Sequence, residues 1–151
     1  MDAKRVLILG VGNLLLADEG VGVHALRALR ACALPAGVEL VDAGTNALDF
    51  LDEMLAAERI VIVDALRADG SPGTIYRVSP DELSADPDRP LSVHQVGVLE
   101  ALGMARQLGA RAEVTIIGVE PETIDWGMEL SPAIAARLAQ VLDALRAEVA
   151  R

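Results

Sequence analysis

The sequence opens with a short aliphatic run that ends in a Gly-x-Gly step, and this combination restricts the folds open to the chain. Residues 5–10 read as a buried parallel strand, because they are almost continuously apolar rather than alternating. A strand that ends in Gly10-Val-Gly12 is typical of the first strand of an open α/β sheet whose next helix binds a dinucleotide. The opening therefore predicts an α/β fold.

The loop after this strand departs from the dinucleotide-binding pattern. Position 15 is Leu where that pattern has its third glycine, and Asp18 and Glu19 stand where a pyrophosphate would lie. Two carboxylates repel an anion and attract a cation, so the loop favours a metal. A nucleotide-binding α/β module remains an alternative, because of the Gly-x-Gly step and the acid Asp42 after the next strand.

Strands and helices alternate along the rest of the chain, which predicts a three-layer α/β/α fold with a five-stranded, mostly parallel mixed sheet. The loop 68–73 is too short for a crossover helix, so strand 74–78 is expected to be antiparallel. We expect one domain over residues 1–151. The expected strands are 5–10, 38–42, 59–64, 74–78 and 113–119, and the expected helices are about 20–32, 46–57, 93–108 and 132–150.

Charge and composition narrow the partners. The net charge of −10 argues against nucleic acid and anionic membranes, which both select basic surfaces. No apolar run reaches the roughly 18 residues that a membrane span needs. A single cysteine, Cys32, allows no internal disulfide, and no histidine is expected beside it to make it a nucleophile. We expect a cytoplasmic monomer.

Polar side chains follow the strands at the carboxyl edge of the predicted sheet, where ligands of such sheets bind. One further polar residue, His94, lies in Ser92-Val-His-Gln95, which reads as a capping box at the start of a helix. We expect the positive end of that helix to lower the pKa of His94 and keep it neutral, the form that binds metals. The edge residues are Asn13, Asp18, Glu19, Asp42, Thr45, Asp64 and residues 118–122.

One histidine and several carboxylates at one crevice suit a borderline cation such as nickel or zinc, but each residue also has a simpler interpretation. Asp18 directly precedes a helix, so its interpretation as an N-cap is favoured over that as a ligand. Glu19 can complement the helix dipole, Asp64 can cap a turn, and His94 can be a structural residue of the helix start. For Asp42 we favour a role in ordering the loop that follows it.

In combination these residues resemble one known family, the hydrogenase maturation endopeptidases, over essentially the whole chain. The resemblance rests on the order and spacing of several short motifs. They are Gly10-Val-Gly-Asn-Leu-Leu-Leu-Ala-Asp-Glu-Gly-Val-Gly22, Asp42-Ala-Gly-Thr45, Asp64-Ala65, Ser92-Val-His-Gln95, Gly118-Val-Glu-Pro-Glu122 and Leu130-Ser-Pro132.

The resemblance implies an endopeptidase that removes the C-terminal extension of a [NiFe]-hydrogenase large-subunit precursor after nickel insertion. It assigns the metal-binding and catalytic roles to Glu19, Asp64 and His94, with Asp42 in support. The implied metal is the substrate's own nickel, which these residues inspect, although zinc or cadmium could occupy the site and a metal could also polarise the scissile carbonyl. A non-catalytic adaptor that recognises a partner's C-terminus remains the other alternative.

Overall fold

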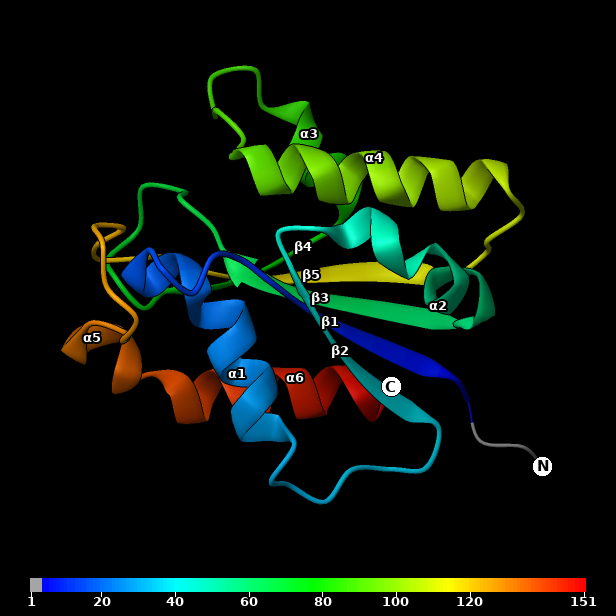
Figure 1. Cartoon of the computed structure of the whole chain (residues 1–151), viewed down its shortest axis with the longest axis horizontal. Coiled ribbons are helices and arrows are strands. Elements are labelled where there is room, and N and C mark those ends of the chain that lie inside the picture. The colour runs from blue at the N-terminus through cyan, green and yellow to red at the C-terminus, as the bar shows by residue number, and fades with distance from the viewer. Residues whose placement is uncertain (1–3) are drawn as a thin grey trace.

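The computed structural model describes residues 4–151, which form a five-stranded sheet with helices on both faces (Figure 1). The strand order is β2-β1-β3-β5-β4, and only β4 runs antiparallel, against β5. The predicted mixed sheet is confirmed, and each predicted strand lies within two residues of an observed one at either end. The strands are β1 (Val6–Val11), β2 (Val38–Gly44), β3 (Arg59–Ala65), β4 (Ile75–Val78) and β5 (Glu113–Val119).

Two aliphatic clusters fill the space between the sheet and its helices. Helices α1 (Val21–Leu29) and α6 (Leu138–Val149) cover one face. Helices α2 (Leu51–Ala56), α3 (Pro80–Ala85) and α4 (Val93–Gln107) cover the other (Figure 1). Because both faces are covered, β1 and β3 are buried along their whole length, which explains their continuous apolar sequence. Within residues 4–151, no helix is long and apolar enough to cross a bilayer.

The helices differ from the prediction mainly at their ends. Helix α1 begins after a 3-10 turn, η1 (Ala17–Gly20), and ends in a tight turn in which the Cys32 N–H donates to the Leu29 carbonyl. The predicted helix 46–57 begins as a 3-10 turn, η2 (Ala47–Phe50), and the predicted helix 132–150 divides into α5 (Pro132–Ala135) and α6.

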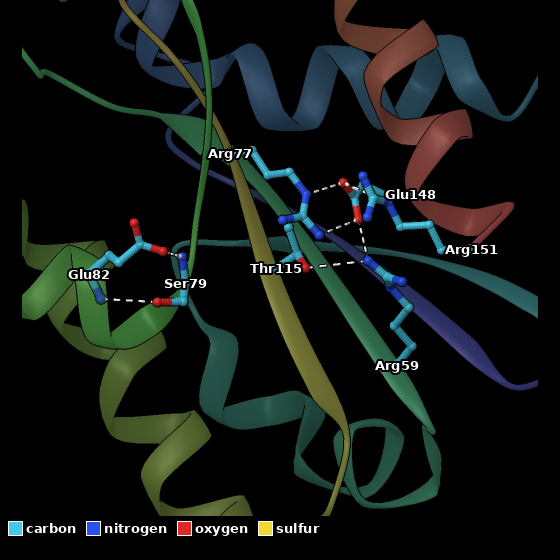
Figure 2. Close-up of polar contacts among 7 residues, drawn as sticks. All are labelled: Arg59, Arg77, Ser79, Glu82, Thr115, Glu148 and Arg151. Carbon is cyan, nitrogen blue, oxygen red and sulfur yellow. Dashed lines mark hydrogen bonds and ion pairs between the residues drawn. The ribbon is translucent and has the colours of Figure 1, made fainter.

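The short helix α3 was not predicted. It begins at a capping box in which Ser79 accepts from the Glu82 N–H and Glu82 accepts from the Ser79 N–H (Figure 2). The signal is therefore present in the sequence, but it precedes only six helical residues.

A buried ion pair fastens the last helix to the sheet. Glu148 of α6 accepts from Arg59 at the start of β3 and from Arg77 of β4 (Figure 2). Arg59 also donates to the Thr115 hydroxyl of β5, over 3.3 Å. This network lies at the amino end of β3, whereas the predicted site residue Asp64 lies at its carboxyl end.

Candidate functional site

The carboxyl ends of β1 and β3 and the start of α4 meet at one edge of the sheet, on the left in Figure 1. Glu19, Asp64 and His94 come together there. The His94 Nδ1 lies 3.3 Å from the Glu19 Oε1, and its Nε2 lies 3.1 Å from the Asp64 Oδ1. The imidazole therefore lies between two carboxylates, one at each ring nitrogen.

The glycine step after β1 brings Glu19 to this position. Gly12 has a φ of +136°, and a Cβ on it would lie 2.0 Å from the Glu19 carbonyl oxygen. Only glycine allows the turn η1 to approach the end of β1 so closely. The space that a pyrophosphate would need beside this glycine is thus filled by the protein's own backbone, which counts against the nucleotide-binding alternative.

Asp64 lies at the end of β3, the central strand of the sheet. It is the penultimate residue of β3, which pairs with β1 on one side and β5 on the other, and it is 4% exposed. Its Oδ1 accepts from the Ala65 N–H over 2.8 Å and faces His94. Two strand neighbours and this local bond therefore hold the carboxylate in place.

The start of α4 orients His94. The predicted capping box is present: Ser92 accepts from the Gln95 N–H, and Gln95 accepts from the Ser92 N–H. The Gln95 amide also donates to the Ala65 carbonyl over 3.1 Å, which ties the helix start to the end of β3. This second role of Gln95 was not predicted, because the capping pattern alone accounts for a glutamine at this position.

The surroundings change the pKa of both buried groups. Burial raises the pKa of Asp64 to about 6, although the hydrogen bond and charge of His94 act in the opposite direction. Burial lowers the pKa of His94, but the hydrogen bond and charge of Asp64, and then the charge of Glu19, outweigh it and raise the pKa above 6.5. The predicted lowering of the His94 pKa was therefore wrong, because the contacts with two nearby carboxylates raise it.

Two cavities open beside the imidazole and share Glu19 and His94 in their walls. The larger, of about 270 Å³, also contains Asn13 and Thr45, which the sequence had placed at this edge. The smaller, of about 90 Å³, is lined by Arg67, whose cationic side chain was not predicted to be near the site. Each cavity exposes part of the triad to a ligand.

The donor types at the site suit a borderline divalent cation, but their arrangement is that of a hydrogen-bonded triad. Both ring nitrogens of His94 face carboxylates, so an ion can bind the imidazole only by displacing one of these contacts. Across residues 4–151, no three His, Cys, Asp or Glu side chains are arranged so that they could hold an ion together. The assignment of metal ligands therefore stays a prediction.

Asp18 has a different role from its neighbour Glu19. It is fully buried and does not cap a helix, so its interpretation as an N-cap was wrong. Its carboxylate accepts from the N–H groups of Glu122, Thr123 and Ser131 and from the Ser131 hydroxyl, over 2.7–3.0 Å. These partners lie more than 100 positions later in the chain, so local sequence could not reveal them.

Asp42 lies at the end of β2, exposed to solvent. Its Oδ1 accepts from the Gly44 N–H over 3.0 Å, and Gly44 has a φ of +52°. The prediction that Asp42 orders this loop is confirmed. The loop in turn places Thr45 in the wall of the larger cavity.

Known proteins share this fold and much of this sequence. A model of the family described as "Hydrogenase maturation protease" matches residues 23–148. The chain is 36% identical over 149 residues to the hydrogenase 2 maturation protease of Escherichia coli, covering 94% of this chain and 91% of that protein. A solved structure, the hydrogenase maturating endopeptidase HybD from E. coli, matches with a TM-score of 0.87 and 33% identity, over 96% of this chain and 91% of that one.

Other relatives are longer than this chain. The hydrogenase expression/formation protein HupD of Rhodobacter capsulatus is 37% identical over 139 residues, which is 89% of this chain and 66% of that protein. The chain similarly spans 65% of the HupD of Thiocapsa roseopersicina, with 38% identity over 146 residues.

Proposed function

Because the chain belongs to the hydrogenase maturation protease family, we propose that it is an endopeptidase that cuts the C-terminal extension from a [NiFe]-hydrogenase large-subunit precursor after nickel insertion. The observation that carries the proposal is the placement of His94 between Glu19 and Asp64 at the cavity-lined edge of the sheet. We assign both nickel inspection and catalysis to these three residues.

In the proposed reaction, the buried pair Asp64–His94 supplies the general base and the general acid of peptide hydrolysis. Burial raises the pKa of Asp64 to about 6, and the hydrogen bond and charge of Asp64 raise the pKa of the His94 imidazole, so the pair consists of a proton acceptor and a proton donor in contact. In the proposed reaction, the Asp64 carboxylate takes a proton from the attacking water. The His94 imidazolium then donates a proton to the nitrogen of the departing peptide.

Nickel enters this scheme as part of the substrate. Glu19 is the most open of the three side chains, at 16% exposure, and it lines both cavities beside His94. A divalent cation presented there would compete with the imidazole for the Glu19 carboxylate. A precursor without nickel leaves the triad closed, so cleavage waits for the loaded substrate.

The test compares nickel-loaded and nickel-free precursor, each incubated with chelator-stripped protease and weighed by mass spectrometry. We expect only the loaded precursor to lose its extension. Glu19→Gln, Asp64→Asn and His94→Ala should each abolish most of the processing, whereas Asp52→Asn, an exposed charge on α2, should have no effect. Equal processing of both precursors would refute nickel inspection, and processing of neither would refute the peptidase function.

A further inference from the structure

Exposed apolar side chains gather around the site. Ten large apolar residues are exposed within the described residues 4–151, and six of them lie on the segments that border Glu19 and His94; one of the six, Val96, lies on α4 two positions after His94. Val93 and Ile124 line the two cavities directly. The other three are Leu15, Trp126 and Met128, which are 48%, 83% and 66% exposed; we call these three the apolar patch.

Backbone hydrogen bonds join the two segments that carry the apolar patch. The Gly127 N–H donates to the Leu15 carbonyl over 2.9 Å, and the Ala17 N–H donates to the Gly127 carbonyl over 2.8 Å. This parallel bridge joins the loop after β1 to the loop after β5, two segments that lie side by side at the carboxyl edge of the sheet (Figure 1). Leu15, Trp126 and Met128 flank the bridge directly.

The buried side chain of Asp18 holds the loop after β5 in place. Its buried carboxylate binds Glu122, Thr123 and Ser131, which bracket the segment that contains Trp126 and Met128. The patch is therefore displayed on an ordered support. Trp126 is 83% exposed in a chain with three aromatic residues, and exposed apolar side chains that are grouped in this way are typical of interaction sites.

The form of the patch favours one kind of partner. Neither cavity beside His94 has Leu15, Trp126 or Met128 in its wall, so these side chains lie outside the path of a peptide that enters the cavities. They lie on the two bridged segments that border the site, so a folded protein whose tail enters the cavities would lie against them. Aromatic and methionine side chains are also enriched at the buried centres of protein interfaces.

From this arrangement we infer that Leu15, Trp126 and Met128 form a preorganised docking surface for the folded body of the large-subunit precursor, separate from the cavities that receive the scissile segment. The inference rests on the proposed function. Substrate selection is then divided between two surfaces. The cavities bind the scissile segment, and the apolar patch binds the apolar surface of the folded precursor.

The experiment measures binding, so that its outcome does not depend on cleavage. Trp126→Ser, Leu15→Ser and Met128→Ser are each made in a Glu19→Gln background, which on the proposed function holds the precursor uncut. Kd is measured for immobilised folded precursor and for a synthetic peptide that spans the cleavage site and extension. Leu108→Ser, at the far end of α4 and 60% exposed, is the matched control.

We expect Trp126→Ser to raise the Kd for folded precursor at least tenfold, with smaller increases of about threefold for the other two patch variants. Leu108→Ser should leave that Kd unchanged, and peptide binding should be the same in every variant. Unchanged binding of the precursor by the patch variants, or an equal loss for peptide and precursor, would overturn the inference. If the wild-type chain fails to cut the precursor while the patch variants still lose binding, the proposed function fails and the docking surface stands.

Discussion

The buried carboxyl of Asp64 leads to a prediction that separates function from stability. The folded chain raises the pKa of Asp64 from 3.8 to about 6, chiefly through burial. The folded state therefore holds the Asp64 proton to higher pH than the unfolded chain does. The contribution of Asp64 to stability consequently falls as the pH rises from about 4 toward 6, and above that range the ionised carboxylate is a net cost.

The size of this cost follows from the pKa change. One pKa unit corresponds to about 1.4 kcal/mol, so ionised Asp64 reduces the free energy of unfolding by about 3 kcal/mol above pH 6. Asp64→Asn keeps the shape and the Oδ1 acceptor but removes the charge. We therefore expect the variant to be about 3 kcal/mol more stable than the wild type at pH 8.5, and about equal to it at pH 4.

Urea unfolding at pH 4 and at pH 8.5 measures both values. The difference between the unfolding free energies of variant and wild type cancels the contributions of the other titrating groups. His94 is the exception because it contacts Asp64, so the two pH values are chosen below and above the ordinary pKa of histidine. Asp52→Asn is the control, with no expected change at either pH. A variant that is equally stable or less stable than the wild type at pH 8.5 would refute the reasoning that burial dominates at Asp64.

Three further predictions concern the stability of the fold. Glu148→Gln leaves Arg59 buried without its counter-charge and should lower the unfolding free energy by about 3 kcal/mol at pH 7. Burial raises the pKa of Glu148, but Arg77 and then Arg59 outweigh it and lower the pKa. The difference between variant and wild type should therefore vanish as the pH falls below 4.5, measured by urea unfolding. Gly22→Ala places a Cβ about 2.2 Å from the Val63 carbonyl and should destabilise the chain by about 3 kcal/mol or prevent folding, measured by thermal unfolding. Asp18→Asn replaces an acceptor oxygen that faces N–H groups and should cost about 2 kcal/mol, with faster hydrogen exchange at those amides.

The sheet was largely predictable because its signals are local. Both β1 and β3 are buried on two faces, which requires apolar residues at every position and makes the strands visible as aliphatic runs. The antiparallel direction of β4 followed from the short loop before it. Helix α3 and the division between α5 and α6 escaped prediction because each concerns only a few residues.

The meeting of Glu19, Asp64 and His94 was predictable from topology, whereas the electrostatics of the site were not. The rule that ligands bind at the carboxyl edge of parallel strands places these residues together without any knowledge of side chains. The pKa of His94 instead depends on which groups lie within about 3.3 Å of its ring. The hydrogen bond and charge of Asp64 and the charge of Glu19 outweigh burial at that range, and the sequence does not contain these distances.

The adjacent acidic residues Asp18 and Glu19 have different roles at the same site. Glu19 faces the cavities and His94, while Asp18 points inward and binds the loop that displays Trp126. Their backbones are continuous through the turn η1, and Gly12 allows that turn to approach the end of β1. The loop after β5 is therefore hydrogen-bonded to the residue directly before Glu19. The contacts of the site and those of the loop that carries Trp126 therefore begin from two adjacent residues of the chain.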